Sequence, residues 1–407
     1  MDEVLSIGYP LGYHESTCGY CSPPGQRSFA STNRCSAALD ASQLSCQFYE
    51  CMIDRGWRRS GTYCYRPDLS RSCCPQYVIK LDSLAFKLTK RQRKLLKDRW
   101  NRYVLYDKDG GKSRQVHPET TFPDVVHASE AGFHSTADAS HRFEVILEPS
   151  SFTQEKFELY CKYQKDIHHE DEKRPSGFKR FLVDSPLQPN PIPYTEPPPP
   201  HLPKAYGSYH QLYRLDGQLI AMAVLDILPS CVSSVYFMYD KTWERFSLGK
   251  LSAIREISLV REIHDAGVEQ VQYLYLGFYI HSCPKMRYKG DYFPSYLADP
   301  ETYEWVPLEK CVPMLDQHRY ASFSHPEHSI KLEEPVPKGQ YIIHALPCPT
   351  AWLSKYHSVD VDVRPDTPDD ELLGEVNYIV DVESTTVIAA PIKVRHRVYA
   401  YTSSSTS

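Results

Sequence analysis

The most regular pattern of hydrophobic and polar positions lies in the second half of the chain. There, two runs of β-forming residues flank Asp216-Gly217, a dipeptide typical of tight hairpin turns. A third β-type run, a stretch of apolar residues at helical spacing closed by Gly267, and a fourth β-type run follow. The five segments are predicted at residues 209–215, 218–228, 232–239, 249–266 and 271–280. Their order, β-β-β-α-β with an initial meander, predicts an α+β layer fold.

Weaker patterns precede this unit. They predict helices over residues 48–57, 87–103 and 151–168, and strands over residues 77–81 and 141–147. Residues 186–203, PLQPNPIPYTEPPPPHLP, are proline-rich and are expected to form an extended loop. Residues 25–45 are small and polar, which indicates a poorly ordered insertion.

At 407 residues the chain is too long for one ordinary core, and about 100–200 residues per domain suggests two or three domains. The patterns divide the chain into five parts. They are a cysteine-rich N-terminal domain (11–84), a basic helix (85–104), a variable connector (105–140), a second domain that contains the proline-rich loop (141–330), and an acidic C-terminal extension (331–407).

Charge is distributed unevenly. The formal net charge is −5, but residues 1–104 hold 16 basic and 9 acidic residues, a net of +7, so the remainder carries −12. Residues 331–390 alone hold 4 basic and 11 acidic residues. The overall charge argues against a general nucleic-acid coat protein, whereas a basic front part is typical of contact with a polyanion. Within residues 87–103, eight cations face a single acid, Asp98, so this helix is either a phosphate-binding surface or a solvated face.

Apolar runs are short. The longest, Leu219–Leu225, has seven residues, whereas a membrane helix needs about twenty. The N-terminus, MDEVLSIGYPLGY, has an acidic start and no apolar core of a signal peptide. We therefore expect no membrane partner and a cytoplasmic protein, with the nucleus as a second compartment.

Eight of the thirteen cysteines lie in the first 74 residues. Without a secretion signal, a disulfide framework is the weaker interpretation, and a metal or redox site is favoured. Cys18-x-x-Cys21 followed by the close pair Cys73-Cys74 is a metal-binding pattern, and Cys46-x4-Cys51 is a rival pair. Four thiolates suit both zinc and an iron–sulfur cluster, so the sequence leaves the metal open. It also leaves open the roles of Cys35, Cys46, Cys51 and Cys64.

Several segments together resemble a known family. They are CGYC, RGWRRSG (55–61) and CCPQY in the first domain, and FTQEKFELYCKYQ (152–164), SGFKRFLVDSPL (176–187), the run from Gly207 to Asp240, SLGKLSAIREI (247–257) and the run from Gly277 to Leu308 in the second. In this order they resemble the arginyl-tRNA–protein transferases over most of residues 11–325. The connector 105–140 and the extension 331–407 lie outside the resemblance.

The resemblance implies an aminoacyltransferase with an acetyltransferase-like (GNAT) catalytic domain over residues 141–330. It implies transfer of arginine from arginyl-tRNA to the α-amine of proteins that begin with Asp, Glu or oxidised Cys, which marks them for ubiquitin-dependent degradation in the N-degron pathway. It places the metal on Cys18, Cys21, Cys73 and Cys74. It implies arginyl-tRNA and acidic N-termini as partners, with no DNA partner and no nucleotide cofactor.

The reaction itself needs little machinery. The ester on the tRNA is already activated, and an α-amine with a pKa of about 7.7–8.0 is partly neutral at pH 7. Positioning and a modest proton relay are therefore expected to suffice. We expect a cation to hold the acidic first side chain, and the candidates are His281, Lys285, Arg287 and Lys289. An anion must hold the arginine guanidinium or accept the amine proton, and the candidates are Asp226, Asp240 and Glu256, the last two as catalytic residues.

Two further sets of residues complete these expectations. Ser247 and Gly249 open a helix directly after a strand, where free backbone N–H groups can face the ester or the tRNA end. The predicted tRNA ligands are Arg58, Arg59, Lys90, Arg91, Arg93 and Lys94.

Two alternatives remain. An acyl-CoA N-acetyltransferase would need a glycine-rich phosphate loop before the helix, and SLGKLSA offers one glycine. A non-catalytic adaptor that binds tRNA or metal explains the cysteines and the basic helix but not the polar CPKMRYKG segment (283–290). The sequence does not identify the proton acceptor, the oligomeric state or the role of the acidic extension.

Overall fold

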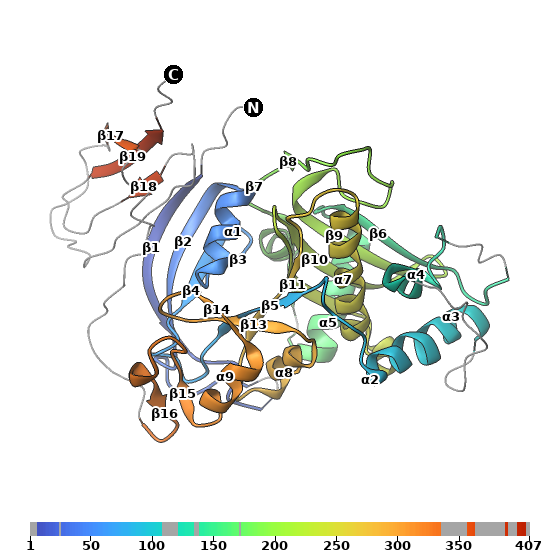
Figure 1. The fold of residues 1–407 in the computed structure, drawn as a ribbon, viewed down its shortest axis with the longest axis horizontal. Helices are drawn as coiled ribbons and strands as arrows, with labels where there is room; N and C mark the ends of the chain where they lie inside the picture. The colour runs from blue at the N-terminus through green and yellow to red at the C-terminus, as the bar shows by residue number, and fades with distance from the viewer. Residues whose placement is uncertain are drawn as a thin grey trace.

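The computed structural model describes residues 6–23, 26–107, 121–133, 138–170 and 172–334, together with the backbone of three strands within residues 356–403. It is a mixed α/β structure in which a smaller sheet lies beside a larger one (Figure 1). The predicted connector and acidic extension lie in part outside the described residues.

The smaller sheet is built from the N-terminal part of the chain. Its strands are β1 (Ile7–Ser16), β2 (Arg34–Ser45), β4 (Tyr63–Pro67) and β3 (Arg58–Ser60), in that antiparallel order, and β7 (Leu187–Gln188) adds parallel to β2. The expectation of a poorly ordered insertion at 25–45 is wrong for β2. Its residues Ala38, Ala41 and Leu44 are buried, so they form part of a packed face and not of a loop.

Helix α1 (Cys46–Asp54) follows β2 directly, and it begins two residues before the predicted helical segment 48–57 and ends three residues before that segment does. It begins where the Ser45 hydroxyl accepts a hydrogen bond from the Phe48 N–H at 3.1 Å, as an N-cap does. Phe48, Tyr49, Met52 and Ile53 are buried along one side and join the main core. The chain then passes through Gly56, at φ +88°, into β3.

The larger sheet runs through the centre of the molecule. Its order is β14 (Trp305–Pro307), β13 (Ser295–Ala298), β5 (Tyr77–Asp82), β12 (Tyr273–Tyr279), β11 (Cys231–Tyr239), β10 (Gln218–Ile227), β9 (Ala205–Leu215) and β6 (Phe143–Pro149), and β8 (Asn190–Pro191) pairs with β9. The predicted hairpin is present at β9 and β10, where Asp216 (φ +52°) and Gly217 (φ +83°) form the turn.

Strand β5 comes from the cysteine-rich part of the sequence but pairs inside the larger sheet. It lies between β12 and β13 and is antiparallel to both. Residues Tyr77–Leu81 of this strand are buried. The expected boundary at residue 84 therefore does not coincide with a boundary between the two sheets.

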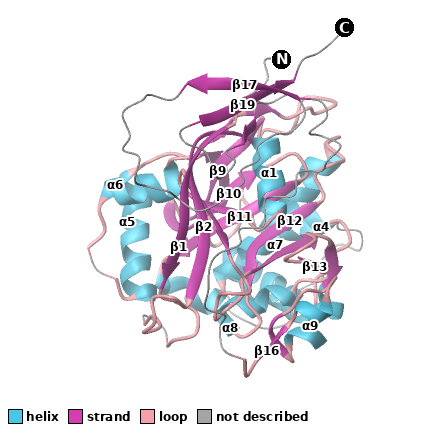
Figure 2. Cartoon of the chain, turned by 90° about the vertical axis from the view of Figure 1, so that its left-hand side faces the viewer, coloured by secondary structure: helices cyan, strands magenta, loops and turns pink. Residues whose placement is uncertain are grey.

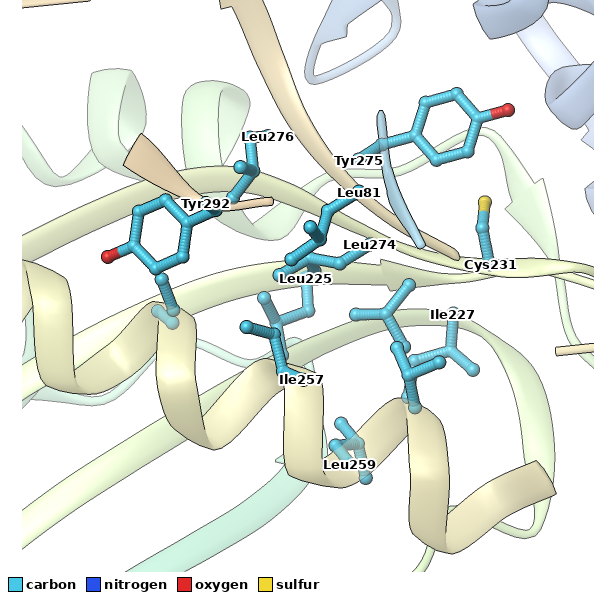
Figure 3. Packing of buried hydrophobic residues seen from close by; sticks show 14 of the residues in the cluster. Leu81, Leu225, Ile227, Cys231, Ile257, Leu259, Leu274, Tyr275, Leu276 and Tyr292 are labelled. Carbon is cyan, nitrogen blue, oxygen red and sulfur yellow. The ribbon is translucent and has the colours of Figure 1, made fainter. Parts of the chain in front are cut away.

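Helices cover both faces of the larger sheet (Figure 2). One face carries α7 (Leu248–Asp265) and α4 (Phe122–His127). The opposite face carries α5 (Gln154–Tyr163), η2 (Gln164–His168), α6 (Pro175–Phe178) and η3 (Lys179–Val183). Strand alternation explains the division, because Met222 and Val224 of β10 pack on the α5 side while Ala221, Ala223 and Leu225 join the core on the α7 side. Figure 3 shows Ile257 of α7 directed toward Leu225 and Leu274 of the sheet.

Strands β11 and β12 are parallel neighbours that separate. They pair only at Cys231–Ser233 with Tyr273–Tyr275, and α7 connects them. Beyond this point β12 shifts register against β5 between Tyr275 and Phe278, and Gly277 there has φ +72°. Such a backbone angle favours glycine. Residues 234–237 of β11 are correspondingly half-buried instead of buried.

The remaining described elements lie around this frame. The basic segment forms one continuous helical stretch of α2 (Lys90–Arg93), η1 (Lys94–Asn101) and α3 (Arg102–Tyr106). The others are η4 (Lys241–Phe246), α8 (Pro284–Arg287), η5 (Tyr288–Asp291), α9 (Leu308–Leu315), β15 (His318–Tyr320), η6 (Pro326–His328), β16 (Ile330–Lys331), β17 (Tyr356–Asp362), β18 (Val387–Ala389) and β19 (Arg397–Ser403). Among the described helices, none combines the length and apolar character of a membrane span.

A buried ion pair joins the two sheets. Arg59 of β3 donates from Nε to Asp226 Oδ2 at 2.9 Å and from a terminal nitrogen to Asp226 Oδ1 at 2.5 Å. The two side chains are 3% and 0% exposed, and Arg59 also donates to the Ser208 hydroxyl. Burial alone would lower the pKa of Arg59, but the charge of Asp226 outweighs it and the net pKa is raised. Nearby, Gly61 lies so close to the Arg180 carbonyl that a Cβ would stand 1.9 Å from it.

Removing one member of this pair is expected to destabilise the protein strongly, because the other charge stays buried without a partner. We expect Arg59→Met or Asp226→Leu alone to cost about 3–5 kcal/mol, and the double variant to cost less than the sum of the two. Urea unfolding midpoints test this. Replacing the exposed pair Arg142–Glu144 is the control and should leave the midpoint nearly unchanged. Additive effects of the two single changes would show that the pair is not coupled.

Candidate metal centre and candidate substrate site

The four predicted cysteine ligands come together in space. The sulfur atoms of Cys18, Cys21, Cys73 and Cys74 all lie within 4.8 Å of one another. Cys73 Sγ is 3.7 Å from Cys21 Sγ and 3.9 Å from Cys74 Sγ. Four sulfurs at a zinc–sulfur distance of about 2.3 Å from one centre form a tetrahedron with edges of about 3.8 Å. The cluster therefore has the spacing of a single-ion site.

Two loops supply these sulfurs. The first follows β1, where the Cys18 N–H donates to the Ser28 hydroxyl and the Tyr20 N–H donates to Cys18 Sγ. The second precedes β5, where the Cys73 N–H donates to the Asn33 carbonyl. Hydrogen bonds from the neighbouring thiols of Cys73 and Cys74 lower the pKa of Cys18. The hydrogen bond to Cys18 conversely raises the pKa of Cys73 and of Cys74, so it is the sulfur spacing that supports a metal site.

The other four N-terminal cysteines lie outside the cluster. Cys35, Cys46 and Cys64 are buried. The Cys46 thiol donates to the Gln188 carbonyl, and burial raises the pKa of Cys46 and Cys64 to about 12 and of Cys51 to about 11. These are properties of inert buried thiols. The rival pair Cys46 and Cys51 is therefore not a metal site in this structure.

The cysteine cluster packs against the end of β12 and the segment that follows. Cys18 and Cys74 form a buried group with Ile280 and Cys283, and Met286 packs against it. The next residues carry the four predicted cations for the acceptor. The candidate metal centre and the candidate acceptor site are therefore neighbours, although their residues are far apart in sequence.

The four cations differ in their surroundings. His281 is held between the Tyr279 hydroxyl at 2.8 Å and Asp316 Oδ1 at 2.8 Å. Arg287 is exposed and 4.0 Å from Asp316, and Lys285 is also exposed. Lys289 instead points inward and donates to the Phe278 carbonyl at 2.7 Å. Burial and then the charge of Arg58 lower the pKa of Lys289 to about 7, so its amine is partly neutral near pH 7.

Two of the three predicted acids are committed elsewhere. Asp226 is fully buried in its pair with Arg59, so its predicted substrate contact is wrong in this structure. Asp240 caps η4, where it accepts from the Thr242 N–H at 3.0 Å and hydroxyl at 2.8 Å, and it pairs with Lys162. Burial would raise the pKa of Asp240, but these contacts lower it, which makes the carboxylate a weaker base. The geometry therefore supports a capping role for Asp240 in place of the predicted catalytic one.

Glu256 remains as the buried acid of the set. It is 2% exposed on the sheet-facing side of α7. Ser252 donates to Glu256 Oε1 at 2.6 Å and itself accepts from the Tyr213 hydroxyl. Its neighbour Arg255 pairs with Glu130 and Glu262 instead, so Arg255 and Glu256 do not form an ion pair with each other. Burial raises the pKa of Glu256.

The start of α7 has the predicted strand-to-helix geometry. Ser247 adopts φ +52° and precedes the helix, whose N-terminal N–H groups lie in its first turn. Gly249 is half-buried, and a Cβ there would touch the Phe237 ring at 3.6 Å. Glycine is therefore not sterically required at this position.

The basic helical stretch presents its charges outward. Lys90, Arg91, Arg93 and Lys94 are exposed, while Leu95, Leu96 and Trp100 are buried on the inner side. The prediction of Arg58 and Arg59 as phosphate ligands is wrong in this structure, because both are buried. Arg58 donates to the carbonyls of Ile53 and Trp57, and Arg59 is paired with Asp226.

Sequence patterns did not identify three polar residues around Glu256. Ser252, Ser234 and Tyr292 come from α7, β11 and the segment after η5. The one available signal is Ser252 four residues before Glu256, which puts both on one side of a helix. Ser234 and Tyr292 lie on other elements far from Glu256 in sequence, so no local pattern links them to it.

Comparison with known proteins gives consistent matches over both parts. The family model for "Arginine-tRNA-protein transferase, N terminus" matches residues 16–94, and that for its C terminus matches residues 155–299. Arginyl-tRNA–protein transferase 1 of Drosophila melanogaster is 33% identical, over 78% of this chain and 85% of that protein. Arginyl-tRNA–protein transferase 1 of Arabidopsis thaliana is 30% identical, over 77% and 74%. An aspartate/glutamate leucyltransferase of Pseudomonas syringae is 27% identical, over 66% and 87%.

Metal content is expected to depend on the four clustered cysteines alone. Cys74→Ser should reduce bound metal and destabilise the N-terminal part, because metal binding contributes to its folding. Cys46→Ser is the matched control, a buried cysteine outside the cluster, and should retain the metal. Elemental analysis of the purified variants measures this. Loss of metal from Cys46→Ser together with retention by Cys74→Ser would overturn the assignment.

Proposed function

The chain belongs to the arginyl-tRNA–protein transferase family, and from this premise we propose that it transfers arginine from arginyl-tRNA to the α-amine of proteins that begin with Asp, Glu or oxidised Cys. The products are marked for ubiquitin-dependent degradation in the N-degron pathway. The observation that carries this proposal is that the N-terminal and C-terminal family models match one chain in order.

The reaction is an aminoacyl transfer. The acceptor amine attacks the carbonyl of the ester that links arginine to the tRNA. A C–N bond forms, the C–O bond to the ribose breaks, and the proton lost by the amine ends on the ribose oxygen. The protein's contribution is to align amine and ester and to exclude competing water. Lys289 is one of the predicted acceptor cations, but its amine is partly neutral, and it is our candidate for a transient proton acceptor.

We propose an acetyltransferase-like arrangement for the catalytic domain. Its support is the pair of parallel strands β11 and β12, which are connected by α7, pair over three residues and then separate. Such a separation opens a sheet toward substrates from both sides. The arginyl end of the donor tRNA and the N-terminus of the acceptor protein would meet there, next to Glu256 and Lys289.

For the metal we propose a single zinc ion held by the four clustered cysteines. The sulfur spacing supports it, because an iron–sulfur cluster distributes its thiolates over several iron atoms and separates them further. The ion would supply structural cohesion to two loops that come from distant parts of the N-terminal sequence. Free thiols throughout the described part fit a reducing compartment, and we propose the cytoplasm, with the nucleus as a second location.

Activity is tested by mixing the purified chain with labelled arginyl-tRNA and a peptide that begins with Asp. Transfer of label to the peptide is expected, and its absence would contradict the proposed function. Arg287→Gln should then raise KM for the Asp peptide roughly tenfold, because the variant cannot form a charged hydrogen bond to the acceptor carboxylate. The variant should also reduce the preference of the enzyme for peptides that begin with Asp over peptides that begin with Asn. Lys204→Gln, another exposed cation, is the charge control.

The tRNA affinity of the variant shows whether Arg287 binds the carboxylate of the acceptor or a phosphate of the tRNA. Arg287→Gln should leave tRNA affinity nearly unchanged. If tRNA affinity falls and the Asp/Asn ratio stays the same, Arg287 is a phosphate ligand and the acceptor pocket lies elsewhere.

The exposed cations of the basic stretch are expected to contact the tRNA backbone. Replacing Lys90, Arg91, Arg93 and Lys94 with Ala should weaken binding and make the salt dependence of log K shallower, by about 0.7–0.9 for each phosphate that the variant no longer neutralises. Binding titrations at several salt concentrations measure the slope. The matched control replaces four exposed cations of the α5–α6 side, Lys165, Arg174, Lys179 and Arg180. Equal slopes for both variants would show that the stretch is an ordinary solvated surface.

A further inference from the structure

A carboxylate buried beside the separated strands is left without a cation. Glu256 is 2% exposed, and among the described residues no lysine, arginine or histidine forms an ion pair with it. Oε1 accepts from the Ser252 hydroxyl at 2.6 Å, whereas no described donor reaches Oε2 with hydrogen-bond geometry. The Ser234 hydroxyl lies near enough to favour the ionised form. Oε1 is therefore held by a hydrogen bond, whereas Oε2 is available to accept one from a ligand.

Such an arrangement is costly in the free protein. Burial of a carboxylate without a countercharge opposes ionisation, and the pKa of Glu256 is raised accordingly. A helix position facing a sheet is normally filled by an apolar residue, as at Ile254 and Ile257 on the same helix. A positive group beside the carboxylate would offset this cost.

The surroundings suit a planar cation. Ser234 is the first residue of β11 beyond its pairing with β12, so Glu256 lies at the point where the two strands begin to separate. Tyr288 and Tyr292 are close enough that, after burial, the charge of Glu256 contributes to raising the pKa of both phenols. Figure 3 shows Tyr292 next to α7. The Tyr292 hydroxyl is buried and has no partner among the described residues, so it offers a second oxygen acceptor.

A guanidinium group matches these features. It is always charged, weakly hydrated and planar, it carries five N–H donors, and it stacks on aromatic rings. The site offers a carboxylate oxygen, a phenol oxygen and two aromatic rings. The other two acids predicted for this task, Asp226 and Asp240, are occupied by Arg59 and by Thr242 with Lys162.

We propose that Glu256 binds the guanidinium of the arginyl group on the donor tRNA and thereby selects arginine as the amino acid transferred. Ser252 positions the carboxylate, and the Tyr213 hydroxyl positions Ser252. This inference rests on the proposed function and extends it to the choice of donor. Glu256 is then a specificity residue, and the proton of the acceptor amine goes elsewhere.

The test compares two amino acids on the same tRNA. The tRNA is charged chemically with arginine or with citrulline, which replaces the guanidinium by a neutral urea group of nearly the same shape. For the wild-type protein, transfer of arginine should be strongly preferred. In Glu256→Gln, kcat/KM for arginine should fall roughly 10- to 100-fold while that for citrulline changes little, because the substitution removes only the charged interaction.

Two further variants make the result specific. Glu50→Gln removes another carboxylate, a half-buried one that accepts hydrogen bonds from Ser230, and should leave the arginine/citrulline ratio unchanged. Glu256→Asp keeps the charge on a shorter side chain and should retain part of the preference. It also replaces Glu256→Gln as the test if that variant does not fold, as judged by its thermal midpoint.

The outcomes separate the possible failures. If the wild-type protein transfers neither amino acid, the proposed function fails. If it transfers arginine and the ratio is unchanged in Glu256→Gln, only the present inference fails. If both donors lose activity equally and the pH profile of kcat loses a limb, Glu256 is the proton acceptor, and the assignment to the guanidinium is overturned.

Discussion

The architecture depends on one desolvated contact, the pair between Arg59 and Asp226. It joins a strand of the small sheet to a strand of the large sheet through two hydrogen bonds in a site closed to water. A pair of this kind contributes little net stability compared with an apolar replacement, but it tolerates only one geometry. Gly61, which lies against the Arg180 carbonyl, restricts the same interface sterically. The two sheets are therefore held in one relative position, and the loops that each sheet carries meet in a defined way.

That fixed position brings together three chemical features. The cysteine cluster, supplied by the loop after β1 and the loop before β5, packs on Ile280 and Cys283 at the end of β12. The same segment carries His281 and Arg287 toward Asp316 and directs Lys289 inward. Glu256 lies beside the separation of β11 and β12. The cluster, the cations after β12 and the buried Glu256 are therefore all grouped around the end of β12 and the separation of β11 and β12.

The sequence predicted the local elements well because their signals are local. The Asp216-Gly217 hairpin and the α7 helix follow from turn chemistry and helical spacing, and the family resemblance selected the four clustered cysteines over the rival pair that spacing left open. What it missed depends on tertiary partners. Arginine is a typical phosphate ligand, so the sequence alone suggested that role for Arg58 and Arg59. Only the fold shows that both side chains are buried. Residues 34–45 are small enough for a loop, and their burial against α1 makes them a strand. The sequence offered Asp226, Asp240 and Glu256 as candidate acids. The structure favours Glu256 because the other two are occupied by partners within the protein.

The place of β5 has a consequence for how the protein is made. This strand leaves the ribosome early, yet both of its partners, β12 and β13, begin only at Tyr273 and Ser295. At roughly 5–20 residues per second, it waits about 10–40 s with two open edges and an apolar sequence. During that interval the central sheet has a gap that only an earlier part of the same chain can fill. Separate expression of the halves on either side of residue 84 would leave this gap open, because the larger sheet is completed only when strands made more than 190 residues apart come together.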